Sequence, residues 1–497
     1  MKTTSISLRI YASLFFAITC IAVPTYGQTT DKPNFVLIFI DDMGYGDIGP
    51  FGNTVNQTPN LDKMAEEGIC LTNFYVSNTA CTPSRSALMT GCYADRIGMD
   101  GGVNFPGESR GLNPREITIA DMLKEAGYAT GCFGKWHMGD QVEFLPLEHG
   151  FDEYAGIPYS NDMWEQHPNS KNWKTQPVPP LTWIEGDEVV AHIPDGKSQA
   201  LLADAITDAA VDFIKRNHDR PFFAYVPHAY VHLPRYTLEE RAKKAEGDVT
   251  RAQIEEVDAS VGRILDTIRE LGIANNTLVL FTSDNGGSIG TSMGPLRGGK
   301  GGPKYEGHMR VPTVAWWPKT IPAGSVSAEI GATIDMLPTL AALAGGKTPA
   351  DRVIDGQDIS DVLLGKPGAK SPHEILYYEY QGIRRGPWKL VRVNKNKEEL
   401  YNLDDDFGET KNLIEQHPDI AAELAALLDS HEQSVTSNKR ESAFVDDPRP
   451  LATADDLNRL PSLAEYRNQA DTSIVEGVSR GGANQPANTA SGQTLDR

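Results

Sequence analysis

Continuous apolar runs of strand length recur along the chain, and most of them end in charged or polar residues. The first run, residues 34–40, is apolar at every position after Asn34, which is typical of a strand buried on both faces. Similar runs follow at 128–134, 221–226, 277–281 and 311–316. Helical patterns alternate with them at 118–126, 199–215, 251–271 and 334–343. This alternation predicts an α/β fold with a large, mostly parallel sheet flanked by helices.

The pattern changes after about residue 365. Short alternating segments predict antiparallel strands at 375–380, 382–385, 388–393 and 399–401, and a helix follows at 420–431. We therefore expect a catalytic domain over 31–365 and a smaller C-terminal α+β subdomain with an antiparallel sheet over 366–437. Residues 438–497 form a polar tail, and its end, from about residue 479, is expected to be disordered.

The first 27 residues have the pattern of a secretory signal peptide. Lys2 and Arg9 precede an apolar run over 10–23, and small residues near Gly27 offer a cleavage point. The run is too short for a membrane span, and no later segment approaches that length. Cys20 as a lipid-anchor cysteine is an alternative that the preceding residues match poorly. The sequence thus predicts a periplasmic or extracellular protein without a membrane span.

The net charge and the cysteine content limit which classes of partner and which kinds of fold are plausible. The 497-residue chain has a net charge of −21, which argues against a nucleic-acid partner. The same charge is unfavourable for an anionic substrate, so a local cluster of cations or a metal would have to overcome it. Removing the signal peptide leaves Cys70, Cys81, Cys92 and Cys132, too few for a disulfide scaffold.

Four of the predicted strands run into groups suited to chemistry. These groups are Asp41 and Asp42, Lys135 and His137, His228 and His232, and Asp284 and Asn285. Any one could be a polar strand end that meets solvent. Together they favour a single site at the carboxyl edge of a parallel sheet. The two aspartate pairs offer only oxygen ligands, which select Ca²⁺ or Mg²⁺.

The segment Cys81-Thr82-Pro83-Ser84-Arg85 begins a predicted helix that Gly91 can end. Pro83 suits the first helical position, so Cys81 would lie just before a helix N-terminus, which favours anions. Arg85 could reach the same anion. Taken alone, Cys81 could equally be a buried structural cysteine.

The five residues in order resemble the signature of the type I sulfatases, and the chain is similar to the arylsulfatase A-like branch over about residues 34–413. Further matching segments are 134–137, 156–160, 298–301, 305–307, 310–312, 386–390, 399–403 and 408–413. The resemblance implies an alkaline-phosphatase-like sheet and a formylglycine at position 81, made from Cys81 by a formylglycine-generating maturation enzyme. It also implies one calcium ion on Asp41, Asp42, Asp284 and Asn285.

The resemblance assigns catalytic roles to Cys81, Arg85, Lys135, His137, His232 and Lys300. It suggests substrate contacts for Ser160, Asn161, Asp162 and His228. His228 remains the alternative to His232 as the active histidine, and Lys304 the alternative to Lys300. In the implied reaction a hydroxyl of the hydrated aldehyde attacks sulfur and His232 protonates the leaving alcohol.

These features predict a secreted sulfatase acting on a sulfated small molecule or glycan. The segment 165–192 has no clear period and, with Trp164, contributes tryptophans suited to a carbohydrate. The alternative enzyme is a phosphate or phosphonate ester hydrolase of the same superfamily, which would need further metal ligands. The non-enzymatic alternative is a secreted carbohydrate-binding protein in which Cys81 stays unmodified.

Overall fold

The computed structural model describes all residues except 2–31, 303 and 478–497. The predicted signal peptide and the end of the tail therefore lie outside the described residues. A ten-stranded sheet forms the body, in the order β13-β2-β12-β11-β1-β9-β5-β6-β7-β8. Its central strands run parallel: β11 (Thr277–Ser283), β1 (Asn34–Ile40), β9 (Phe222–Pro227), β5 (Ala129–Lys135) and β6 (Glu153–Ile157).

Further strands extend the sheet toward both edges through antiparallel pairs, except that the outermost pair on one side, β13 with β2, is parallel. On one side lie β12 (Val314–Trp316), β2 (Ile69–Leu71) and β13 (Ser325–Ser327), and on the other a hairpin of β7 (Thr182–Glu185) and β8 (Glu188–His192). The predicted α/β class and mostly parallel centre are confirmed. The hairpin lies in the segment that showed no clear period. Its strands have four and five residues, and neither alternates strictly between buried and exposed positions.

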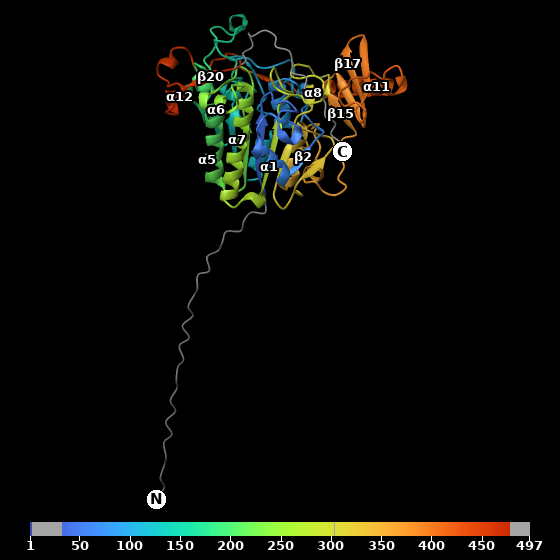
Figure 1. Ribbon diagram of the computed structural model, residues 1–497, viewed down its shortest axis with the longest axis horizontal. Helices are drawn as coiled ribbons and strands as arrows, with labels where there is room; N and C mark the ends of the chain where they lie inside the picture. The colour runs from blue at the N-terminus through green and yellow to red at the C-terminus, as the bar shows by residue number, and fades with distance from the viewer. Residues whose placement is uncertain (2–31, 303, 478–497) are drawn as a thin grey trace.

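The apolar run of β1 is continuous because its two faces contribute to two different cores. Phe35, Leu37 and Phe39 pack into one cluster with α2 (Cys81–Thr90), α3 (Ile119–Glu125) and α9 (Met336–Leu343). The alternate residues pack into a second cluster with α1 (Pro59–Glu67), α5 (Leu202–Asn217) and α7 (Val249–Glu270). The second set of helices covers the sheet face toward the viewer in Figure 1. A strand enclosed in this way has no polar face.

The C-terminal part forms its own four-stranded antiparallel sheet beside the main body (Figure 1, orange). Its strands are β15 (Ile375–Tyr378), β16 (Gly382–Arg385), β17 (Trp388–Asn394) and β18 (Lys397–Asn402). The helix α11 (Pro418–Ser437) packs on this sheet through Leu424 and Leu428. The helix extends beyond the expected 420–431 at both ends, with a proline in its first turn.

The polar segment after residue 438, for which no elements were expected, returns to the main body. Its short strand β19 (Ala443–Phe444) pairs with β4 (Arg110–Gly111), and β20 (Ile474–Glu476) pairs with β10 (Tyr236–Leu238). Between them, α12 (Leu463–Tyr466) begins at a capping box of Ser462 and Glu465. Strands of two or three residues carry no periodicity, and each of these two forms a two-stranded sheet with another short strand from the main body.

Candidate active site

Five neighbouring parallel strands end at one edge of the main sheet. Ile40 pairs with Ser283, Phe39 with Pro227, and Lys135 with Ile157, so the strand ends lie at similar heights. Past these ends lie Asp41, Asp42, Ser160, His232, Asp284 and Asn285, and Lys135 is the last residue of β5. The structure therefore brings together the polar groups that the sequence placed after separate strands.

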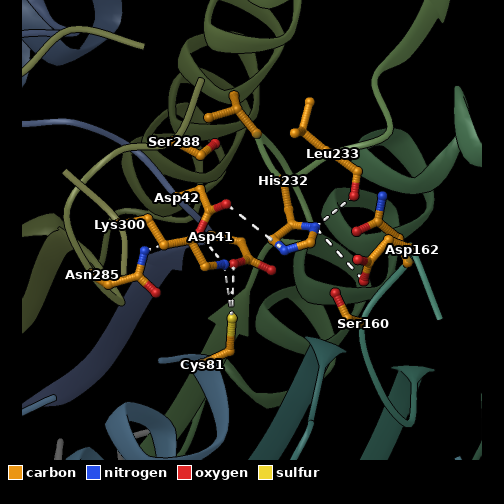
Figure 2. Close-up of polar contacts among 12 residues, drawn as sticks. Asp41, Asp42, Cys81, Ser160, Asp162, His232, Leu233, Asn285, Ser288 and Lys300 are labelled. Atoms are coloured by element: carbon orange, nitrogen blue, oxygen red, sulfur yellow. Dashed lines mark hydrogen bonds and ion pairs between the residues drawn. The ribbon is translucent and has the colours of Figure 1, made fainter. Parts of the chain in front are cut away.

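Cys81 faces this edge from the first turn of α2. The helix begins at Cys81 itself, two residues before the position expected from Pro83, and ends at Gly91 in the left-handed conformation. The Cys81 side chain is buried, with its Sγ 3.5 Å from Asp41 Oδ1 and 3.3 Å from Lys300 Nζ. Figure 2 shows the sulfur pointing into the cluster of charges.

Asp41 is held by two buried cations. Lys135 Nζ pairs with its carboxylate and also donates to Ser160 Oγ at 3.0 Å. Arg85 Nη2 lies 2.9 Å from Asp284 Oδ2 and 3.6 Å from Asp41 Oδ2. Both cations are fully buried, so these pairs act with little screening by water.

Asp42 receives a second set of contacts. Lys300 Nζ lies 2.5 Å from Asp42 Oδ1, and Asn285 Nδ2 donates to the same oxygen at 2.8 Å. On the other side, His232 Nε2 lies 3.7 Å from Asp42 Oδ2. The backbones of Asp42 and His137 both have φ of 62°, a conformation that non-glycine residues rarely adopt and that often marks functional sites.

The carboxylates differ in acidity because their neighbours differ. Burial alone would raise the pKa of Asp41, but Lys135, His232, Arg85 and Lys300 outweigh it and hold that pKa well below its usual value. For Asp284, burial and the nearby Asp41 raise the pKa to about 6 despite Arg85. A third carboxylate at this point is thus difficult to ionise without a further cation.

His232 is oriented by groups on both sides of its ring. Its Nδ1 lies 2.6 Å from the Leu233 carbonyl, so Nδ1–H donates there and Nε2 faces Asp42. Asp162 Oδ1 lies 4.0 Å from Nδ1 (Figure 2). Burial, followed by the charge of Lys300, lowers the pKa of His232 to about 4. The ring is therefore neutral at pH 7 in the absence of a bound anion.

His137 contacts a residue that the sequence did not single out. Its Nε2 lies 3.0 Å from the Asn104 carbonyl, so Nε2–H donates and Nδ1 keeps its lone pair. That Nδ1 is buried and has no hydrogen-bond partner among the described residues. Burial, Lys135 and Arg85 hold the His137 pKa well below its usual value. Asn104 was missed because it acts through its backbone carbonyl, which no side-chain motif can reveal.

The donor set suits a hard divalent cation. Ligand atoms of Asp41, Asp42, Cys81 and His232 all lie within 4.8 Å of one another. Asn285 Oδ1 is buried beside them without a hydrogen-bond partner among the described residues, as a group awaiting a ligand would be. Carboxylate and amide oxygens are calcium ligands, so Asp41, Asp42 and Asn285 fit the predicted ion. The fourth predicted ligand, Asp284, is not part of this cluster, and its Oδ2 pairs with Arg85.

Two predicted contact residues lie outside the cluster. His228 is buried with its Nε2 3.0 Å from Ser260 Oγ on α7, so of the two histidines only His232 meets the carboxylates. Asn161 donates to Gln199 Oε1 at 3.0 Å and accepts from Gln199 Nε2 at 2.9 Å. These exchanges tie Asn161 to the region before α5, whereas its neighbour Ser160 contacts Lys135.

Glycines allow the close approaches that build the edge. Gly134, before Lys135, has φ of +135°, and a Cβ there would lie 1.9 Å from the Pro227 carbonyl oxygen. Gly286, after Asn285, would place a Cβ 1.9 Å from the Gly307 carbonyl oxygen. Neither position can hold a side chain without separating the segments that carry the site.

Comparisons with known proteins agree with this geometry. The sulfatase family model matches residues 33–346, and a model of the N-sulphoglucosamine sulphohydrolase C-terminal region matches residues 303–434. Human arylsulfatase A is 36% identical over 480 residues, covering 90% of each chain. Dog N-acetylgalactosamine-6-sulfatase is 39% identical over 372 residues, covering 70% of this chain and 68% of the relative.

A solved sulfatase structure from Pseudoalteromonas has the same fold. It superposes with a TM-score of 0.73 at 26% identity, covering 83% of this chain and 92% of that one. The family match spans the five strand ends and α2, and the arylsulfatase A match spans the C-terminal sheet as well. The chain belongs to the sulfatase family, in its arylsulfatase A-like branch, and is a sulfuric ester hydrolase.

Proposed function

We propose that this sulfatase is a secreted enzyme that hydrolyses a sulfate ester on a carbohydrate, with a formylglycine made from Cys81 and one calcium ion. The observation that carries the proposal is the position of Cys81, in the first turn of α2 between Asp41 and Lys300. Burial and the neighbouring Asp41 raise the pKa of the Cys81 thiol to about 12. A thiol held neutral is a weak nucleophile, which argues against an unmodified Cys81 as the working nucleophile.

The hydrated aldehyde would supply a hydroxyl nucleophile, and calcium on Asp41, Asp42, Asp284 and Asn285 would polarise the sulfate. Three cations surround the same point: Arg85, Lys135 and Lys300. Their role is to balance the charge that develops on the sulfuryl oxygens, which is the electrostatic stabilisation on which such transfers depend. Ser160, a hydrogen-bond partner of Lys135, is suited to contact the same oxygens.

The two histidines are suited to different proton transfers. His232 Nε2 is oriented toward the cluster by its Nδ1 contact with Leu233, and an anionic substrate would raise its pKa by favouring the charged ring. It would then protonate the leaving alcohol, with Lys300 nearby. His137 offers an unpartnered Nδ1 lone pair in the site, so it is suited to accept a proton in the second half of the reaction.

A carbohydrate substrate is supported by the names of similar proteins. The dog relative is by name an N-acetylgalactosamine-6-sulfatase. The structures of similar fold include one from work on glycosaminoglycan metabolism in Bacteroides thetaiotaomicron. The phosphate or phosphonate ester alternative would require a second set of metal ligands, and the described residues provide one such cluster, at Asp41 and Asp42.

Secretion and maturation complete the proposal. The predicted signal peptide would direct the chain to the periplasm or the medium, where a sulfated glycan or small molecule is the substrate. No helix in the described part of the chain is long and apolar enough to cross a bilayer. A formylglycine-generating enzyme of the host would act on the segment 81–85 before the buried site closes, because Cys81 is inaccessible in the folded protein.

The proposal is tested by the mass of the peptide that contains position 81, on protein from its native host. A peptide in which aldehyde oxygen replaces sulfur is expected, together with hydrolysis of 4-nitrophenyl sulfate and of N-acetylgalactosamine 6-sulfate. Cys81→Ala should abolish both activities while the circular dichroism spectrum stays unchanged. An intact cysteine in active enzyme would refute the proposal, and faster hydrolysis of phosphate than of sulfate esters would favour the alternative.

A further inference from the structure

A cavity with a volume of 660 Å³ is lined by the two neighbours of Asn104, the residue that contacts His137. Its size lies within the range of small-molecule sites. It lies between a loop of the main domain, the long segment after β6, and a strand of the returning tail. The lining residues that matter here are Val103, Phe105, Glu108, Trp173, Lys174 and Phe444.

One wall of this cavity belongs to the same loop that contacts the site. Val103 and Phe105 flank Asn104, whose carbonyl oxygen lies 3.0 Å from His137 Nε2. The Asn104 amide donates to Thr82 Oγ1 at 3.0 Å, and Thr82 follows Cys81 in the chain. A group bound against this wall would contact the two neighbours of Asn104. Asn104 itself contacts both His137 and Thr82, the residue after the nucleophile position.

The loop is preformed. Arg110 Nε donates to Asn104 Oδ1 at 2.9 Å, and its Nη1 and Nη2 donate to the carbonyls of Asp100 and Gly102 at 2.8 and 3.1 Å. Residues 100–104 are thus held around the Arg110 guanidinium group by three hydrogen bonds. A rigid wall can bind a ligand without losing conformational entropy on binding.

The opposite wall reaches the other side of the active site. The Trp173 ring lies 5.4 Å from that of Phe105 and 5.0 Å from that of His167. His167 Nε2 lies 3.7 Å from Asp162 Oδ2, and Asp162 Oδ1 lies 4.0 Å from His232 Nδ1. The cavity is thus linked through consecutive side chains to His232, the residue proposed to protonate the leaving group.

The lining matches the chemistry of a sugar ring. Trp164 and Trp183 are buried, so of the tryptophans in this segment only Trp173 presents a partly exposed face to the cavity. Phe444 lines the same cavity and is 64% exposed, so its ring is accessible to a ligand. Lys174 and Glu108 add hydrogen-bonding groups for hydroxyls. Aromatic faces for C–H groups with a few polar groups around them suit an amphipathic ligand.

We propose that this cavity is a second sugar subsite, which holds the saccharide unit attached to the sulfated one. The inference rests on the proposed carbohydrate sulfatase activity and makes it more specific. The enzyme then acts faster on sulfated oligosaccharides than on sulfated monosaccharides, because only the former fill the cavity. A small aryl sulfate has no second ring, so changes in the cavity should not alter its rate of hydrolysis.

The test compares kcat/KM for 4-nitrophenyl sulfate, N-acetylgalactosamine 6-sulfate and a disaccharide that carries the same sulfated sugar. The variants are Trp173→Ala and Phe444→Ala, with Phe407→Ala as the control, since Phe407 is also exposed but lies in the loop between β18 and α11. An aromatic contact of up to ~1.5 kcal/mol corresponds to a loss of about tenfold on the disaccharide. The two smaller substrates and the control should show no such loss.

Two results would overturn the subsite. One is equal kcat/KM of the unaltered enzyme for the disaccharide and the monosaccharide. The other is a loss in Phe444→Ala that is the same for all three substrates, which would indicate a general structural effect. Failure of the proposed function is a separate result, because the unaltered enzyme would then not hydrolyse 4-nitrophenyl sulfate. Because Phe444 is so exposed, its variant keeps the test valid even if Trp173→Ala folds poorly.

Discussion

A buried lysine links the C-terminal sheet to the catalytic domain, and replacing it provides a sharp test of how the two parts are joined. Lys389 Nζ, on β17, lies 2.9 Å from Glu306 Oε1 and 2.8 Å from Glu409 Oε1, and all three side chains are fully buried. Glu306 also accepts hydrogen bonds from the hydroxyls of Tyr75 and Tyr378, each at 2.7 Å. Lys389→Met keeps the side-chain length and removes the charge.

The expected effect is large because the variant leaves two carboxylates without their shared cation. Removing one partner of a buried ion pair typically destabilises a protein by 3–5 kcal/mol, roughly the range expected here. The loss should be reduced by changing Glu409 as well, since Lys389→Met with Glu409→Gln removes the second carboxylate. A surface pair of the same geometry should matter much less, by about 0–1 kcal/mol.

The pH dependence of the loss has a defined sign. Burial raises the pKa of Glu409 from its ordinary 4.5 to about 7, although Lys389 opposes the shift. Between about pH 4.5 and 7 the folded state keeps a proton on Glu409 that the unfolded state has lost. The stability contributed by this group therefore falls as pH rises through this range. Without Lys389 the pKa of Glu409 rises further, so the fall extends to higher pH, and the deficit of the variant is smallest near pH 5 and largest above pH 7.

The measurement is urea unfolding at pH 5 and pH 8, followed by fluorescence and circular dichroism together. The control is Lys370→Met, whose Nζ also lies 2.9 Å from its partner, Glu329 Oε1, but whose side chain is 81% exposed. If Lys389→Met lowers the free energy of unfolding no more than this control at pH 8, the reasoning about uncompensated buried charge is wrong. A deficit that does not depend on pH would refute the assignment of the raised pKa to Glu409.

Three further predictions address the active site itself. Chelation of divalent ions should lower both sulfate ester hydrolysis and Tm. Added calcium should restore both, because ligand binding stabilises the folded state. Unchanged activity and Tm after chelation would exclude a bound calcium ion. Gly134→Ala should prevent soluble folding, because its Cβ would meet the Pro227 carbonyl oxygen at 1.9 Å, whereas Gly186→Ala, with open space around it, should yield soluble protein. His137→Gln should lower kcat by about 10²–10⁴-fold with Tm nearly unchanged, and the exposed His218 provides the control substitution; a decrease below tenfold would contradict a role in proton transfer.

The sequence predicted the α/β class and the strand ends because both follow from local rules. A run such as residues 34–40 is apolar throughout only when both faces of a strand are covered, and the register of parallel strands then brings their ends together. The cap of α3 was also predictable from the spacing of Thr118 and Asp121. The Thr118 side chain accepts a hydrogen bond from the Asp121 amide, and the Asp121 side chain accepts one from the Thr118 amide. These features need no knowledge of distant contacts.

Other features depend on contacts that no local pattern encodes. Both His228 and His232 follow β9, and only the path of the intervening loop gives one to Ser260 and the other to Asp42. The strands β19 and β20 each pair with a short strand that lies more than 200 residues away in the sequence. Every residue type has a backbone carbonyl, so the sequence could not indicate that the carbonyl of Asn104 contacts His137.

The C-terminal sheet is better understood as part of the active site's support than as an accessory. Glu306 begins α8 (Glu306–Met309), and its amide donates to Glu409 Oε2 at 2.7 Å. The Gly286 amide donates to the carbonyl of His308 at 3.0 Å, so α8 also holds the segment that carries Asn285. Because the Lys389 pairs fix α8 from one side and Gly286 contacts it from the other, a change in the sheet must be felt at Asn285. Loss of the sheet should therefore displace Asn285, one of the residues proposed to hold calcium, before it changes the main core.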